Sequence, residues 1–293
     1  MGGLRETHRA GPGIRLDRRE VPLTRAIPDT LTADGHRSAA RRARLPVAVV
    51  LAGSLSFCAA PRAGGPGDFA PVPGVRTLEG SPIGGHPYRL RLPEGATPER
   101  PARLLVWLHP STASFNQQAE ALVPALAARG YALLVVTDKN FEGWTRDETR
   151  QLFEGTLPVV ARTPGLDARR PVLLGFSAGG QLALLLWLQF PGAFSGAAIV
   201  GAEPVAFLAG GASREIEPPP GDAARATPLW VLEGAREPGA RMWRGIEKSW
   251  GDAGARLELR IAAGRGHEWL LAEPSERDAF LAWIEKLGPP AAR

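Results

Sequence analysis

Short apolar runs of strand length alternate with amphipathic stretches of helix length along most of the chain, beginning near Val75. Strands that alternate with helices predict an α/β fold with a mostly parallel central sheet and helices on both faces. The predicted strands are 75–79, 86–92, 104–108, 131–136, 172–174, 197–200, 229–232 and 256–262. The predicted helices are 115–129, 147–161, 180–190, part of 238–254, and 275–287.

The pattern divides the chain into three parts. Residues 1–60 form an N-terminal extension, 61–74 a linker rich in Gly and Pro, and 75–293 one large folded domain. The first two strands suit an antiparallel edge of the sheet, while 203–227 shows no regular pattern. In a mostly parallel sheet, ligands bind beyond the carboxyl ends of the strands. The loops that follow the parallel strands are therefore expected to converge on one site.

The basic excess of the chain lies in the N-terminal extension. Residues 1–58 hold ten Arg against five Asp or Glu, which leaves 25 basic and 25 acidic residues of the chain's 35 and 30 for the remainder. Nucleic-acid binding depends on clustered Lys and Arg. The neutral balance of the predicted domain therefore argues against a nucleic-acid partner.

The extension ends in an apolar segment, 45–60, that follows Arg41, Arg42 and Arg44. Basic residues, a short apolar core and small residues at its end are typical of a secretory signal peptide, and a membrane span needs about 20 apolar residues. Cys58, the single cysteine, is either removed with the peptide after Ala59 or Ala60 or becomes a lipid-anchored first residue. The sequence therefore predicts a secreted or periplasmic protein, and a lipid anchor at Cys58 stays open as its single route to a membrane.

The sequence PVLLGFSAGG, residues 171–180, reads as a buried strand that runs into a sharp turn and then a helix. Ser177 in Gly-Phe-Ser-Ala-Gly fits the nucleophile elbow, in which a serine hydroxyl is exposed on a strained turn between strand and helix. Glycines two positions before and after the serine allow the tight turn. Ser177 is the candidate nucleophile.

A serine nucleophile needs a base and a group that orients the base. Three histidines lie outside the extension, and His267 follows the last predicted strand, as the order Ser, acid, His requires. The acid is expected after strand 229–232, where Glu237 is the first candidate and Glu233 the second. His86 lies in an early edge strand, and His109 is expected to shape the loop after 104–108.

An oxyanion hole needs two backbone N–H groups. Ala178, directly after the candidate nucleophile, is expected to supply one, and the loop after 104–108 the other. Pro110 has no N–H. Ser111 is therefore the candidate second donor, with Thr112 behind it.

Four stretches together resemble the signature loops of the α/β-hydrolase superfamily, and their order along the chain is WLHPSTAS, GFSAGGQLALLLWLQFPGAF, VLEGAREP and GRGHEW. The elbow region is similar to secreted polyhydroxybutyrate depolymerases and feruloyl esterases, and less closely to dienelactone hydrolases. The resemblance spans about residues 75–288. It implies hydrolysis of small or polymeric esters through an acyl-enzyme on Ser177, with His267 and Glu237 and without metal or organic cofactor. Pro110 stands where these relatives usually have Gly.

Aromatic residues lie in or beside the site loops. Phe115, Trp144 and Trp269 are candidates for an acyl or aryl pocket, whereas Trp107, inside a predicted strand, is expected in the core. Two other functions stay open. One is a serine peptidase of the same fold, and the other is a surface binding protein whose catalytic parts have decayed.

Overall fold

The structure is a computed structural model that describes residues 71–111, 116–138, 141, 143–207, 213–219 and 221–288. The N-terminal calls on 1–60, including Cys58, lie outside the described residues, as do Thr112 and Phe115. Among the described residues, no helix combines the length and the apolar character that a membrane span requires.

An eight-stranded sheet forms the centre of the fold, in the order β1-β2-β4-β3-β5-β6-β9-β10. Its strands are β1 (Val75–Gly80), β2 (Tyr88–Pro93), β3 (Ala102–Leu108), β4 (Tyr131–Val136), β5 (Leu166–Phe176), β6 (Gly196–Val200), β9 (Leu229–Gly234) and β10 (Leu257–Ala262). β1 and β2 pair antiparallel at one edge, β2 pairs antiparallel with β4, and the remaining pairs are parallel. The prediction of a mostly parallel sheet with an antiparallel edge is confirmed.

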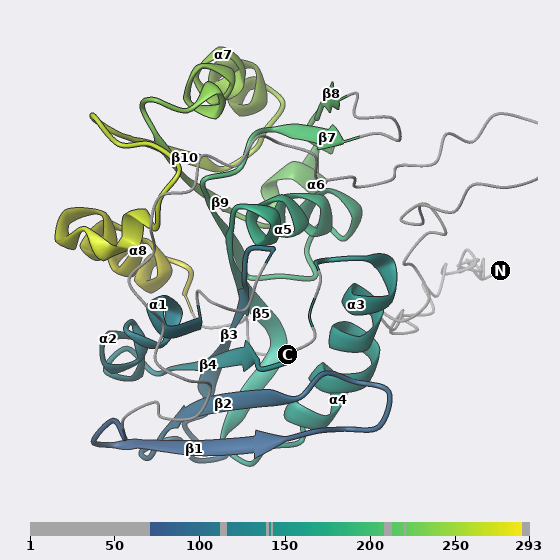
Figure 1. Ribbon diagram of the computed structural model, residues 1–293, viewed down its shortest axis with the longest axis vertical. Coiled ribbons are helices and arrows are strands. Elements are labelled where there is room, and N and C mark those ends of the chain that lie inside the picture. The colour runs from purple at the N-terminus through teal and green to yellow at the C-terminus, as the bar shows by residue number, and fades with distance from the viewer. Residues whose placement is uncertain are drawn as a thin grey trace, which may run out of the picture.

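Helices cover both faces of this sheet (Figure 1). They are α1 (Asn116–Glu120), α2 (Val123–Ala127), α3 (Arg146–Arg150), α4 (Leu157–Val160), α5 (Ala178–Gln189), α6 (Asp222–Arg225), α7 (Pro238–Asp252) and α8 (Pro274–Lys286). In β3, Leu104 and Val106 belong to the core cluster that contains α5 and α7, while Leu105 and Trp107 belong to the cluster that contains α2 and α8. Both faces of a central parallel strand are therefore buried, and Trp107 is a core residue as expected.

The single helix predicted over 115–129 is wrong, because the described part of it forms two short helices, α1 and α2. Pro124 occupies the first turn of α2. Proline has no N–H to continue the hydrogen-bond ladder of α1, but it fits the start of a new helix. The chain therefore turns at Ala121 and Leu122 before the second helix begins.

The helix predicted over 147–161 is also divided, into α3, the π-helical segment η4 (Gln151–Thr156) and α4. The N–H of Leu157 donates to the carbonyl of Leu152, five residues back. A Cβ on Gly155 would lie 2.2 Å from the carbonyl oxygen of Gly84. The π-helical segment thus packs closely against the loop at Gly84, and no side chain larger than glycine fits at position 155.

The stretch after β6, which showed no pattern, contains a two-stranded hairpin of β7 (Val205–Phe207) and β8 (Ser213–Glu215), followed by α6. The side-chain amide of Gln181 in α5 donates to the carbonyl of Val205. This bond ties the hairpin to the helix that begins at the elbow. Short strands in a small separate sheet carry too little apolar alternation to be recognised from sequence.

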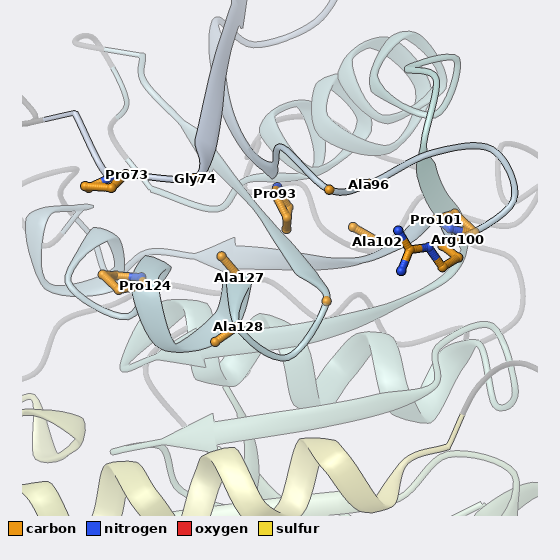
Figure 2. Close-up of a pocket in the computed structure, with 12 residues that line it drawn as sticks. Pro73, Gly74, Pro93, Ala96, Arg100, Pro101, Ala102, Pro124, Ala127 and Ala128 are labelled. Atoms are coloured by element: carbon orange, nitrogen blue, oxygen red, sulfur yellow. The ribbon is translucent and has the colours of Figure 1, made fainter.

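Figure 2 shows the residues that line a cavity of about 600 Å³. The cavity lies at the amino ends of β3 and β4, whereas the elbow follows the carboxyl end of β5. Ala102 at the amino end of β3 and Gly130 just before β4 line it, together with several Pro and Ala residues. Arg100 is the one ionisable residue among the residues that line it. This cavity brings together no nucleophile and base, so it is not the candidate active site.

Candidate active site

Ser177 stands at the turn between β5 and α5. Its backbone has φ 53° and ψ −118°, and no other non-glycine residue of the described chain has a positive φ. Residues other than glycine rarely adopt this backbone conformation, because it costs about 1–3 kcal/mol. It persists where the surrounding structure enforces it. The N–H of Ser177 donates to the carbonyl of Val200 at 2.9 Å, which helps to hold the turn.

Two glycines make this turn sterically possible. A Cβ on Gly175 would lie 2.2 Å from the carbonyl oxygen of Gly179, and a Cβ on Gly179 would lie 1.8 Å from the carbonyl oxygen of Leu108. No side chain fits at such distances. The motif glycines therefore bring the first turn of α5 against the end of β3, which carries the loop with Pro110 and Ser111.

His267 reaches Ser177 from the loop after β10. Its Nε2 lies 3.0 Å from the Ser177 Oγ, within hydrogen-bond distance of a nucleophile and its base. The imidazole is 43% exposed and stacks on the Phe176 ring, with ring centroids 5.4 Å apart and an interplanar angle of 25°. Two residues 90 positions apart in the chain, both selected from the sequence, are thus in contact.

Glu237 faces the other nitrogen of the imidazole. Its Oε2 lies 3.9 Å from the His267 Nδ1, and its side chain is 29% exposed. The two loops pack closely, since a Cβ on Gly234 would lie 2.4 Å from the carbonyl oxygen of Gly266. A separation of 3.9 Å is longer than a hydrogen bond, and such contacts often tighten only when substrate binds.

Glu233, the second candidate acid, lies inside β9 and is 1% exposed. Its Oε1 accepts the N–H of Gly234, and its Oε2 has no hydrogen-bond partner within the described part of the chain. The pKa of the Glu233 carboxyl is raised to about 8, chiefly by burial, and the charges of Glu237 and Glu203 add to the rise. At neutral pH this carboxyl is therefore protonated and supplies no negative charge to an imidazolium.

The raised pKa of Glu233 predicts a pH-dependent stability. The folded protein keeps a proton between about pH 4.5 and pH 8 that the unfolded chain has lost, so this group lowers the free energy of unfolding as pH rises. We expect the free energy of unfolding of the unmodified protein to fall by up to about 2 kcal/mol between about pH 6.5 and pH 8 because of this group. Glu233→Gln should abolish this decrease. Urea unfolding at both pH values measures it.

The exposed Glu247 of α7 offers the matched control for this measurement. Glu247→Gln makes the same chemical change at an exposed position and leaves Glu233 in place, so the loss of stability between the two pH values should persist. An unchanged dependence in Glu233→Gln would show that Glu233 is ionised in the folded state.

The candidate oxyanion donors lie on two adjoining segments. Ala178 is the first residue of α5, and the first N–H groups of a helix have no acceptor within the helix. Ser111 is exposed just beyond Pro110, in the loop whose carbonyls at Leu108 and His109 adjoin Gly179. The role of both N–H groups stays a prediction.

His109 supports this loop from within the core. Its Nδ1 donates to the carbonyl of Pro110 at 2.8 Å, and the indole N–H of Trp144 donates to the His109 carbonyl at 2.7 Å. Burial lowers the pKa of His109 to about 4, so the ring is neutral at physiological pH. These bonds fix the backbone that leads to Ser111.

Trp144 and Trp269 are both more than nine-tenths buried. Trp144 packs on the rings of His109 and Phe141, and Trp269 packs edge-on against Trp107 and Phe176. Their rings thus support the walls of the site, and a contact with substrate stays a prediction.

Sequence reasoning missed Phe176, which contacts His267. Its place inside the elbow motif was visible, but its ring contacts His267, which lies 91 positions further along the chain.

Comparison with solved structures places this geometry in a known fold. A dienelactone hydrolase structure from Klebsiella pneumoniae is similar at 17% identity and TM-score 0.55, over 73% of this chain and 98% of that chain. A ferulic acid esterase structure is similar at 14% identity and TM-score 0.55, over 73% and 98%. The Pyrococcus horikoshii acylaminoacyl peptidase is similar at 13% identity and TM-score 0.54, over 75% of this chain and 42% of that chain.

At these identities the similarity concerns the fold. The chain has the α/β-hydrolase fold, as the four stretches of sequence led us to expect. No family model and no curated protein sequence matches the chain.

Proposed function

We propose that this protein is a serine hydrolase of carboxylic esters that uses Ser177, His267 and Glu237. The contact of 3.0 Å between His267 Nε2 and Ser177 Oγ, at a serine held with φ 53°, is the observation that carries the proposal. A serine is a poor nucleophile at neutral pH, and a histidine at this distance is the group that activates it. Glu237 is the carboxylate that faces the remaining ring nitrogen.

The reaction follows from these positions. The Ser177 Oγ attacks the ester carbonyl as His267 Nε2 takes its proton, and the Ala178 and Ser111 N–H groups stabilise the negative oxygen. Glu237 stabilises the imidazolium. The imidazolium then gives its proton to the departing alcohol, and a water activated by His267 hydrolyses the acyl-enzyme in the same way.

Esters are proposed ahead of peptides because the match covers nearly the whole of two structures named as an ester-type hydrolase and an esterase. This chain spans 98% of the dienelactone hydrolase and ferulic acid esterase structures but 42% of the acylaminoacyl peptidase. The additional part of the peptidase therefore has no counterpart in the aligned region. Matched ester and anilide substrates with the same acyl group separate the two activities, and a higher kcat/KM for the anilide would reverse this ranking.

Labelling by a fluorophosphonate tests for an activated serine. We expect one equivalent of a small alkyl fluorophosphonate to attach to the full chain at Ser177, identified by peptide mass mapping, because the reagent requires the serine to be activated by its base. His267→Ala removes that base and is expected to slow the labelling by about 10³-fold or more.

Failure of the unmodified protein to label would favour the binding protein whose catalytic parts have decayed. Labelling of several serines at similar rates would favour the same alternative, because it would show that no single serine is activated. Ser195→Ala is the matched control, because Ser195 bonds the carbonyl of Arg170 and has no base beside it in the described structure. This variant should label as fast as the unmodified protein.

Export is the second part of the proposal, and it is supported by the arginines and apolar segment within 41–60. Expression of the full chain in a bacterium is expected to yield a protein whose new N-terminus follows Ala59 or Ala60, or begins at a lipid-modified Cys58. Intact mass and N-terminal sequencing distinguish these forms. A retained segment 41–60 on the mature protein would contradict export by this route.

A further inference from the structure

A fully buried histidine that the proposed reaction does not use lies between two carboxylates. His86 precedes β2 and is 0% exposed. Its Nδ1 is 3.5 Å from Asp138 Oδ2, and its Nε2 is 3.2 Å from Glu148 Oε2. The side chains of Asp138 and Glu148 are 26% and 24% exposed, so the cluster has a route to solvent.

The hydrogen bonds of His86 indicate which nitrogen is free to bind a ligand. Nε2 lies 2.9 Å from the backbone carbonyl of Glu148, so it carries the proton and donates to that oxygen. In the neutral ring, Nδ1 then has a lone pair, and this buried atom has no hydrogen-bond partner among the residues that the structure describes. Two acceptor atoms that face each other without a hydrogen atom between them repel, and a cation placed between the Nδ1 lone pair and the Asp138 carboxylate would stabilise both.

The spacing fits a metal ion in that position. Two ligands of a tetrahedral ion with bonds of about 2.0–2.1 Å lie about 3.3 Å apart. The 3.5 Å between Nδ1 and Asp138 Oδ2 is close to that value and is longer than a good hydrogen bond. One potential ligand atom from each of His86, Asp138 and Glu148 lies within 4.8 Å of the other two.

The backbone holds His86 in place before any ion binds. The N–H of His86 donates to Thr156 Oγ1 at 2.7 Å, and the Thr156 hydroxyl donates to the His86 carbonyl at 3.0 Å. The bond from Nε2–H to a carbonyl is the second contact that metal-binding histidines usually make, because it fixes the tautomer and the ring orientation. The bonds to Thr156, the last residue of the π-helical segment, therefore hold His86 as a rigid ligand.

We propose that His86 Nδ1 and the carboxylates of Asp138 and Glu148 bind one divalent transition-metal ion such as Zn²⁺, which requires the Glu148 carboxylate, 3.2 Å from Nε2 in the structure, to turn toward Nδ1. One imidazole and two carboxylates suit this class of ion, and water completes the coordination. The ion is structural and takes no part in the proposed ester hydrolysis. It joins the segment before β2, the loop after β4 and helix α3.

The position of the site explains what such an ion does for the neighbouring loop. Phe141 lies between His86 and His109, with ring centroids 6.2 Å and 4.1 Å away, and Trp144 donates to the His109 carbonyl. An ion that holds Asp138 and Glu148 together therefore restrains the segment that carries Phe141 and Trp144. That segment in turn supports the backbone before Ser111.

Metal titration of the untagged full chain tests the proposal. After treatment with a chelator and its removal, Zn²⁺ is titrated calorimetrically and metal content is measured by mass spectrometry. We expect one tightly bound equivalent and a rise in melting temperature of about 5 °C at a hundredfold excess over Kd. Asp138→Asn and Glu148→Gln should each weaken binding by about tenfold or more.

Asp147→Asn is the matched control, because this neighbouring carboxylate in α3 is exposed and pairs with Arg150. It should bind Zn²⁺ as the unmodified chain does. Co²⁺ gives a second readout, since its visible spectrum reports its ligands, and Glu148→Gln should change that spectrum. The proposal is overturned if the unmodified chain binds no Zn²⁺, or if Asp138→Asn and Glu148→Gln bind it as tightly as Asp147→Asn.

Discussion

Replacement of Ser177 by alanine is expected to lower the kcat for a short-chain p-nitrophenyl ester by about 10⁴- to 10⁶-fold, which is the loss typical of a removed serine nucleophile. The hydroxyl that His267 Nε2 contacts at 3.0 Å disappears, while the imidazole and the elbow remain. Residual hydrolysis should reflect only stabilisation by backbone N–H groups and substrate binding. The effect is measured as kcat from steady-state rates, with the enzyme concentration taken from the mass of protein added.

The fold should survive this change. Alanine at φ 53° experiences the same backbone strain as serine, and the bond from the residue 177 N–H to Val200 is retained. We therefore expect a free energy of unfolding within about 1 kcal/mol of the unmodified value. Turnover by Ser177→Ala at the original rate would exclude Ser177 as the nucleophile.

Replacement of Glu237 by glutamine is expected to lower kcat by about 10³-fold, with a smaller change in KM. The carboxylate that lies 3.9 Å from His267 Nδ1 stabilises the imidazolium formed during attack, and a neutral amide does not. In a related arrangement, loss of the orienting carboxylate costs about 10⁴-fold in kcat. The exposure of Glu237 argues for the smaller figure, because water screens its charge.

Glu233→Gln is the matched control for this experiment. The same chemical change is made four residues earlier, at a buried carboxyl that is protonated at neutral pH because its pKa is about 8. We expect kcat to stay within about threefold of the unmodified enzyme. A larger loss in Glu233→Gln than in Glu237→Gln would reassign the orienting acid to Glu233.

The same pair of residues illustrates where sequence reasoning ends. Glu233 and Glu237 both follow the apolar run of β9 closely, and chain order alone does not separate a buried carboxyl from one that faces a histidine. The structure separates them because β9 extends to Gly234, which places Glu233 inside the sheet. Where a strand ends depends on its partner β10, which pairs with Glu233 and Gly234.

Helix boundaries met the same limit. The apolar periodicity over 115–129 and 147–161 marked the presence of helices correctly for the described part of each region. Their division depends on Pro124 and on the contact of Gly155 with Gly84, and the second of these is a packing event between segments 71 positions apart. Local patterns hold no information on such contacts.

The sequence by itself determined the α/β architecture, the elbow at Ser177 and the choice of His267, because the period of apolar residues and short glycine-rich motifs are local properties. Only the tertiary structure decided that His267 touches Ser177, that Glu233 is buried, and that His86 lies between Asp138 and Glu148. These contacts join segments that lie far apart in the sequence. Their distances follow from the twist and order of the whole sheet, which no single stretch of the chain encodes.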